Sequence, residues 1–202
     1  MPRIAGQIDL AKTEAILEAT SQAIHERGLA VSVDEIARRA GVSKQTIYNH
    51  YGSKTDLVRA LIERRVELIT QVLDVEGAVE DPQAALASYA RQLLETVTMP
   101  RGLTLFRLII GSVGADPELA PAVFKAGARA SRIKLAAFLA HETAAGRLAV
   151  PDPDEAADFF AGMVVSHRQL AGLLGLEVDL TPAKIDRIAA EAARRFMRAY
   201  AR

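Results

Sequence analysis

The chain has 202 residues, half of them hydrophobic and a quarter charged, as in a soluble globular protein of one or two domains. Its 25 basic and 25 acidic residues cancel, which argues against a general nucleic-acid coat protein, and the absence of cysteine excludes a disulfide framework and thiol chemistry. No apolar run approaches the roughly 20 residues that cross a bilayer, and MPRIAGQIDL lacks the apolar core of a secretory signal, so we expect a cytoplasmic protein with no membrane contact.

Helix signals run along the whole chain and strand alternation is absent, so we predict an all-α fold of about nine helices. Ser32, Ser43 and Ser53 are capping side chains, and four later caps stand directly before a proline, which favours the first helical turn. Pro121 lies too far inside the seventh segment, so we expect a turn at 117–120 before the long helix proper. The predicted helices cover residues 9–27, 33–39, 44–50, 54–75, 82–98, 101–113, 117–145, 154–175 and 181–201.

Residues 33–54 show the pattern of a helix-turn-helix. The first short helix places apolar residues inward at helical spacing, Gly41 permits the sharp turn, and Val42 fills the corner between the helices. In the second helix, Ile47 and Tyr51 lie four residues apart and share the buried face. The outer faces are left with hydrogen-bonding side chains and no carboxylate. These side chains could be only a solvated helix face, but the matched turn and the capping favour a helix that enters the DNA major groove.

The second helix and its C-terminal flank therefore supply the candidate DNA contacts. Gln45 and Thr46, in the first turn, are candidates for base edges, and Tyr48 can offer its ring to a thymine methyl or its hydroxyl to a phosphate. The basic side chains are placed for backbone phosphates, where charge supplies affinity rather than sequence choice. The full set is Lys44, Gln45, Thr46, Tyr48, Asn49, His50 and Lys54.

The run from Ala40 to Lys54 reads A-G-V-S-K-Q-T-I-Y-N-H-Y-G-S-K, and it is preceded by Ile16-Leu17, Gly28 and Ile36-Ala37 at matching positions. The stretch Thr13–Lys54 thereby resembles the DNA-binding domain of the TetR family of bacterial transcriptional repressors. The segments FRLIIGSVGADPELAPAVF and AAFLAHETAAGRLAVPDPDEAADFFAG resemble the C-terminal domain of the AefR-like subgroup.

The resemblance implies a DNA-binding domain in residues 1–54 and a ligand-binding and dimerisation domain in residues 55–202. It also implies a homodimer that binds a palindromic double-stranded DNA operator and releases it when a small-molecule effector enters the C-terminal domain. Within the helix-turn-helix it assigns three side chains to the bases and three to phosphates. The base set is Gln45, Thr46 and Tyr48, and the phosphate set is Lys44, His50 and Lys54.

The last two predicted helices are candidates for the dimer surface. Their apolar stripes fit a plain intramolecular core equally well by periodicity, and the resemblance favours a two-fold four-helix interface. The candidate interface residues are Phe159, Phe160, Met163, Ile185, Ile188, Ala192 and Phe196.

A ligand cavity would lie among the fifth to eighth helices, where polar groups interrupt apolar runs. Arg107 is the leading candidate because a charge on so apolar a helix needs a partner, either an acidic ligand or, as we favour, a protein carboxylate. The candidate lining residues are Tyr89, Met99, Phe106, Arg107 and His167.

Catalytic chemistry is not indicated. His141-Glu142 begins like a zinc-protease motif, but Ala145 stands where the second histidine is required. We expect no enzyme, no cofactor and no metal, and a ligand-responsive DNA-binding regulator that acts as a repressor. The alternatives are an activator, a regulator without a small-molecule ligand, and a helical enzyme or scaffold that merely contains the motif.

Overall fold

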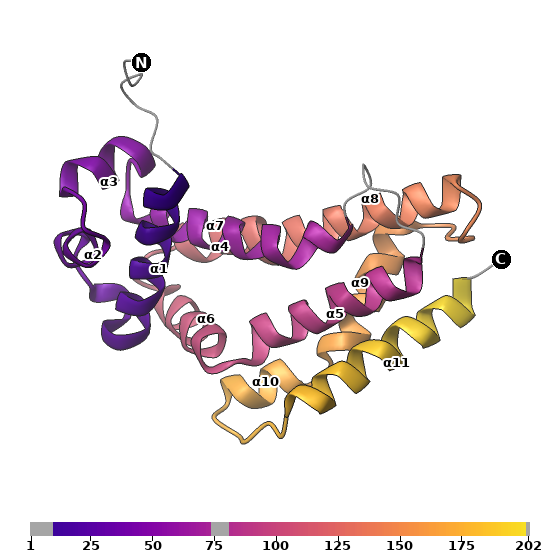
Figure 1. Ribbon diagram of the computed structural model, residues 1–202. Coiled ribbons are helices and arrows are strands. Elements are labelled where there is room, and N and C mark those ends of the chain that lie inside the picture. Colours follow the sequence, from indigo (N-terminus) through magenta and orange to yellow (C-terminus); the bar gives the residue numbers. More distant parts are fainter. Residues whose placement is uncertain (1–9, 74–80, 201–202) are drawn as a thin grey trace, which may run out of the picture. The chain divides into compact units, whose positions relative to one another are not determined.

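The computed structural model describes residues 10–73 and 81–200, and all the regular elements in these ranges are helices (Figure 1). The predicted all-α fold is confirmed, and the predicted helix ends at residues 9, 74–75 and 201 lie outside the described residues. None of the helices in these ranges has both the length and the apolar composition needed to span a lipid bilayer. The α-helices are α1 (Leu10–Arg27), α2 (Val33–Ala40), α3 (Lys44–Tyr51), α4 (Lys54–Thr70), α5 (Pro82–Thr98), α6 (Pro100–Ser112), α7 (Leu119–Phe124), α8 (Ala130–Ala144), α9 (Pro153–Val165), α10 (Arg168–Leu173) and α11 (Pro182–Tyr200).

Two predicted segments differ from the observed elements. The single helix predicted over 154–175 is two helices, because Ser166 has a φ of 49° and a ψ of −142°, which no α-helix can accommodate. The segment 117–145 begins with a turn, as predicted, and Pro121 falls in the first turn of α7, where a missing N–H needs no helical partner. A π-helical turn, Lys125–Arg129, then joins α7 to α8.

The chain packs as two compact units, and neither is one continuous stretch. The first, here called the N-unit, holds the chain up to Arg64 together with Thr104–Ala126. The second, the C-unit, holds Arg65–Leu103 and the chain from Gly127 onward. The boundaries therefore fall inside α4, inside α6 and inside the π turn. The division into functional domains at residue 54 stays a prediction. In the packing, most of α6 and all of α7 belong to the same unit as the helix-turn-helix.

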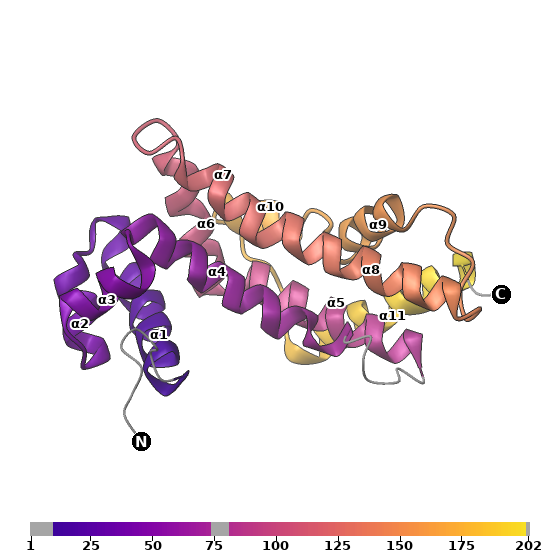
Figure 2. The ribbon, with the colours of Figure 1, turned by 90° about the horizontal axis from the view of Figure 1, so that it is seen from above.

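One hydrophobic core holds the N-unit together. Ile16 of α1, Ile36 of α2, Ile47 of α3 and Leu57 of α4 are fully buried in it, and each contributes about 1.5–3 kcal/mol of burial free energy. Figures 1 and 2 show α1, α2 and α3 gathered together. Helices α6 and α7 complete the same core with Leu105, Ile109, Leu119 and Val123.

The C-unit is built around α5 and α11, which pack side by side (Figures 1 and 2), with α9 in contact with α5, α8 and α11. Aromatic rings mark its centre. The ring centroids of Tyr89 and Phe160 lie 6.2 Å apart, those of Phe160 and Phe196 5.1 Å, and those of Phe196 and Tyr200 4.7 Å. The buried hydroxyl of Tyr89 is hydrogen-bonded to the Ser131 hydroxyl at 2.8 Å, so this polar group in the core is satisfied.

Glu142 closes the turn that follows α8. Its side chain is 0 % exposed, and Arg147 donates to its carboxylate from Nε at 2.5 Å and from Nη2 at 2.8 Å. The backbone N–H groups of Arg147 and Leu148 both donate to the Glu142 carbonyl. The guanidinium of Arg147 already neutralises the charge of this buried carboxylate, so Glu142 has a structural role in the turn.

Replacing Glu142 with glutamine should lower the free energy of unfolding by about 1–3 kcal/mol at neutral pH, because Arg147 loses its charged partner. The guanidinium of Arg147 lowers the pKa of Glu142 below its usual value, against the opposing effect of burial. A lowered folded-state pKa stabilises the fold above the unfolded pKa, and this contribution is lost as the pH falls through the folded value. Urea unfolding at a series of pH values should therefore show the difference between variant and wild type shrinking below about pH 4.5. The exposed Glu177→Gln change is the control. A pH-independent difference would contradict the assignment.

Candidate nucleic-acid interface

Local capping and one glycine set the angle between α2 and α3. The Ser32 hydroxyl accepts the N–H of Glu35 at 3.2 Å, and the Ser43 hydroxyl accepts the N–H of Thr46 at 3.0 Å, so both helices begin at the predicted caps. Gly41 adopts the left-handed conformation, with φ at 66°, that a helix of L-residues needs to end in a tight turn. The helix-turn-helix predicted from the sequence is therefore present in the described structure.

Helix α3 is held from one side only. Ile47 is its one fully buried side chain, and Tyr51, in its last turn, is half-buried. Tyr48 is 39 % exposed, and the His50 ring lies edge-on to the Tyr51 ring with centroids 4.5 Å apart. The remaining exposed side chains of α3 are Lys44, Gln45 and Asn49.

Gln45 and Asn49 form a linked pair one helical turn apart. Nε2 of Gln45 donates to Oδ1 of Asn49 at 2.6 Å. This bond uses one of the two N–H groups of Gln45 and leaves the other, with Oε1, without a partner among the described residues. Thr46 differs, because its hydroxyl is 2.8 Å from the capping hydroxyl of Ser43 and its side chain is half-buried. Of the two first-turn candidates, Gln45 is therefore the better placed to meet a base edge.

The two lysines near α3 are already engaged. Nζ of Lys44 lies 2.7 Å from Oδ2 of Asp34 in α2, and this hydrogen bond raises the pKa of Lys44. Nζ of Lys54 donates to the backbone carbonyls of Leu29 and Val31, the latter at 2.6 Å, and burial lowers the pKa of Lys54. The ammonium group of Lys54 is thus turned toward the connection between α1 and α2. No local spacing in the sequence indicated either contact, since the partners lie 10 to 25 residues away.

Two family models match the chain. Residues 16–61 match the model of bacterial regulatory proteins of the TetR family, and residues 84–202, more than half of the chain, match the C-terminal domain of AefR-like transcriptional repressors. The chain belongs to the TetR family of transcriptional regulators. The resemblance seen in the sequence is confirmed.

Curated relatives of this TetR-family regulator match mainly over part of their length. The transcriptional activator FasR of Mycolicibacterium smegmatis is 45 % identical over 53 residues, which are 26 % of this chain and 24 % of that protein. The repressor LfrR of the same species is 32 % identical over 107 residues, or 52 % of this chain and 54 % of LfrR. The chain thus spans about half or less of the length of the curated relatives that it matches.

Solved structures match over nearly the whole chain. A TetR-family regulator from Mesorhizobium loti superimposes with a TM-score of 0.78 at 24 % identity, over 96 % of this chain and all of that one, and so shows the fold. The flavonoid-responsive regulator FrrA superimposes with a TM-score of 0.67 at 34 % identity, over 94 % of this chain and 97 % of that one. The TetR fold therefore extends through both compact units.

The candidate ligand-lining residues of this regulator are divided between the units. Tyr89, Met99 and His167 belong to the C-unit, whereas Phe106 and Arg107 belong to the N-unit. Tyr89 is fully buried and bonded to Ser131, whereas Met99, His167 and Arg107 are exposed. Tyr89 is thus part of the packed core of the C-unit. A ligand-lining role for the five residues stays a prediction.

The dimer candidates fall into two groups. Four of them are buried among helices of their own chain, because the apolar face of α11 packs against α5 and α9. They are Phe160 of α9 and Ile185, Ala192 and Phe196 of α11. Ile188 is half-buried. Phe159 and Met163, on α9, are 57 % and 41 % exposed. The apolar stripe of α11 thus makes intramolecular contacts, and among these seven candidates Phe159 and Met163 leave the most apolar surface exposed. A role of the seven residues in a dimer stays a prediction.

Proposed function

We propose that this TetR-family regulator represses transcription as a homodimer, binding a palindromic operator through α3 and leaving it when a small molecule enters the C-terminal domain. The observation that carries the proposal is the one-sided anchoring of α3. Ile47 fixes it to the core, and Gln45, Tyr48 and Asn49 stay exposed. Among the relatives, LfrR and the Mycobacterium tuberculosis protein Rv3405c are named repressors, and FrrA is named flavonoid-responsive. FasR is named an activator, which keeps activation as the second candidate.

Within the site, Gln45 supplies base recognition and Asn49 orients it. Adenine presents an acceptor at N7 and a donor at its N6 amino group in the major groove, and a carboxamide matches both at once. Gln45 has one N–H and one carbonyl oxygen left for that purpose after its bond to Asn49. Tyr48 lies beside this pair and offers its ring to a neighbouring thymine methyl. The half-site is therefore expected to contain an A·T pair opposite Gln45.

Affinity comes from phosphate contacts at the edges of α3. Lys44 and His50 are exposed and supply these contacts, and Lys44 exchanges Asp34 for a phosphate on binding. Such an exchange reduces the binding free energy that Lys44 contributes. The complex therefore depends more on base contacts than it would if Lys44 had no partner in the free protein. We assign Lys54 to holding the connection between α1 and α2, since its ammonium group already has two carbonyl acceptors.

The homodimer forms through α9, where Phe159 and Met163 leave apolar surface exposed. A two-fold dimer can bind two half-sites one turn apart only if its recognition helices are about 34–36 Å apart. An effector that binds more tightly to a dimer with another separation of these helices lowers the affinity for DNA. The size of the effect is set by the difference between its affinities for the two forms of the dimer.

The test is a selection from randomised double-stranded DNA with the full chain at low salt, followed by gel-shift titration of the enriched sequence. We expect a palindrome whose half-sites lie one helical turn apart, and an affinity that falls as salt is raised, though less steeply than for a freely cationic surface. Failure of a folded dimer to enrich any sequence would reject the DNA-binding function. A reporter gene behind the enriched sequence distinguishes repression from activation.

A further inference from the structure

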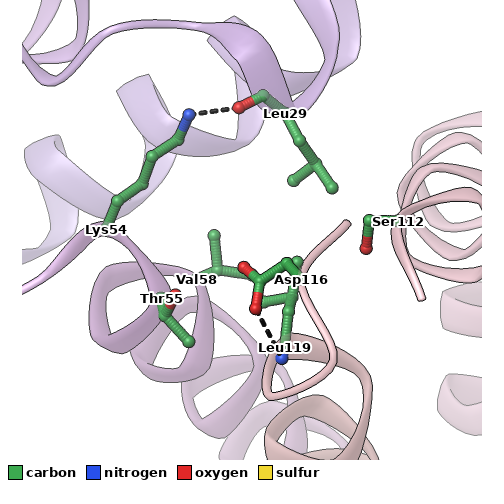
Figure 3. Close-up of a pocket in the computed structure, with 7 residues that line it drawn as sticks. All are labelled: Leu29, Lys54, Thr55, Val58, Ser112, Asp116 and Leu119. Carbon is green, nitrogen blue, oxygen red and sulfur yellow. Dashed lines mark hydrogen bonds between the residues drawn. The ribbon is translucent and has the colours of Figure 1, made fainter. Parts of the chain in front are cut away.

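A cavity of about 320 Å³ lies within the N-unit, where the start of α4 faces the turn between α6 and α7 (Figure 3). This volume is at the lower end of the range of small-molecule sites. The cavity has no part in the contacts of α3 described above. Its lining residues are Leu29, Lys54, Thr55, Val58, Ser112, Asp116 and Leu119.

Part of the cavity wall is apolar. Val58 and Leu119 belong to the hydrophobic core of the N-unit, and the side chain of Leu29 points toward the same space (Figure 3). Lys54 lines the cavity with its methylene chain while its ammonium group is bonded to the backbone carbonyls of Leu29 and Val31 (Figure 3). The positive charge at the cavity is therefore directed at peptide carbonyls and not at the carboxylate across from it.

Asp116 brings a negative charge to this space. Its Oδ1 accepts the N–H of Leu119 at 3.2 Å (Figure 3), and among the described residues its carboxylate has no ion-pair partner. A half-buried carboxylate beside apolar walls loses part of its hydration, and a cation is the partner that compensates this loss. Thr55 and Ser112 also line the cavity, and the hydroxyl oxygen of Ser112 can accept a further hydrogen bond, since this hydroxyl donates its proton to the Ile109 carbonyl at 2.8 Å.

We propose that this cavity binds a small organic cation, a primary alkylammonium whose chain fits within about 320 Å³. Its ammonium group pairs with the carboxylate of Asp116 and donates to the hydroxyls of Thr55 and Ser112. Its alkyl chain lies against Val58 and Leu119. The site goes beyond the proposed function, because it lies in the same compact unit as the helix-turn-helix, and the proposed function assigns no ligand to that unit.

Calorimetric titration and thermal unfolding of the full chain with n-pentylamine at neutral pH test this site. The matched probes are 1-pentanol, which keeps the alkyl chain without the charge, and pentanoate, which reverses the charge. We expect saturable binding and a raised Tm with pentylammonium alone, since binding to the folded state stabilises it by RT ln(1 + L/Kd), where L is the free ligand concentration. Because no DNA is present, the result is independent of the proposed function.

The informative variant is Asp116→Asn, which removes the charge and keeps an oxygen to accept the N–H of Leu119. It should weaken pentylammonium binding at least tenfold while its Tm without ligand stays near that of the wild type. Glu118→Gln is the matched control, because Glu118 is an exposed acid on the same turn and does not line the cavity. Equal binding of 1-pentanol, undiminished binding by Asp116→Asn, or no saturable binding of pentylammonium would each overturn the proposal.

Discussion

Replacing Gln45 with alanine should weaken binding to the selected operator by about 1–3 kcal/mol for each half-site, which is the discrimination that one bidentate contact supplies. The loss arises because adenine keeps its N7 acceptor and N6 donor but meets no carboxamide. Since Gln45 is exposed, its removal should leave the free energy of unfolding unchanged. Fluorescence anisotropy at one fixed salt concentration measures the affinity, and Gln71→Ala is the control, because Gln71 is an exposed glutamine in the turn that follows α4.

A base analogue separates this contact from a general weakening of the interface. Substituting 7-deazaadenine for the adenine opposite Gln45 removes the N7 acceptor and nothing else, so it should weaken the wild type and leave the Gln45→Ala complex unaffected. Asn49→Ala should give an intermediate loss, because it removes the Oδ1 acceptor that orients the Gln45 side chain. Equal sensitivity of wild type and Gln45→Ala to the analogue would contradict the assignment of Gln45 to that base.

Phe160→Ala should cost about 3–5 kcal/mol of unfolding free energy, the range for removing a fully buried phenylalanine. Phe160 is 0 % exposed, and its ring lies between those of Tyr89 and Phe196, so the change leaves a space that these rings cannot fill. Urea unfolding followed by circular dichroism measures the effect. A change below about 1 kcal/mol would show that Phe160 is not in the core of the C-unit.

Substituting the adjacent residue, Phe159→Asp, should leave the stability of the fold unchanged and weaken the homodimer. Phe159 is largely exposed on α9, so a carboxylate there should leave the secondary structure intact and separate the homodimer by placing charge in its apolar contact. Light scattering across a range of concentrations measures the mass of the particle. Leu10→Asp makes the same change at an exposed apolar residue of α1 and should leave the dimer intact. An intact Phe159→Asp dimer would place the interface elsewhere.

Local signals explain why the helix-turn-helix could be predicted closely. Ser32 and Ser43 cap their helices, and Gly41 takes the positive φ that the turn requires, so each boundary depends on residues only a few positions apart. Ile47 is buried as its spacing indicates. These interactions are short-range, and the sequence carries them directly.

The break between α9 and α10 had no comparable signal. Neither glycine nor proline stands at the break, and Ser166 adopts its positive φ in a stretch whose apolar residues continue across it. Similarly, the stripe of α11 showed that one face is buried, but periodicity does not say whether α5 or a second subunit covers that face. Which surface meets which is decided by tertiary packing.

The contacts of Lys44 and Lys54 could not be predicted from the sequence for the same reason. A window without acids indicated a positive face, yet Asp34 reaches Lys44 from the preceding helix, and two backbone carbonyls hold Lys54. The cavity beside Asp116 likewise joins the start of α4 to a turn more than fifty positions further along the chain. Contacts between segments so far apart leave no periodic trace in the residues that make them.

The shared core of the N-unit limits how the DNA-binding segment could be fused to another protein. The matched DNA-binding segment ends at residue 61, but Ile109, Leu119 and Val123 fill the same core as α1 to α4. A chimera that carries only the segment up to residue 61 would replace these three side chains with those of the other protein. Gaps or clashes would then arise in the core on which the DNA-binding helices pack. A graft that keeps its operator preference must therefore bring Thr104–Ala126 along, as a second piece of the same module.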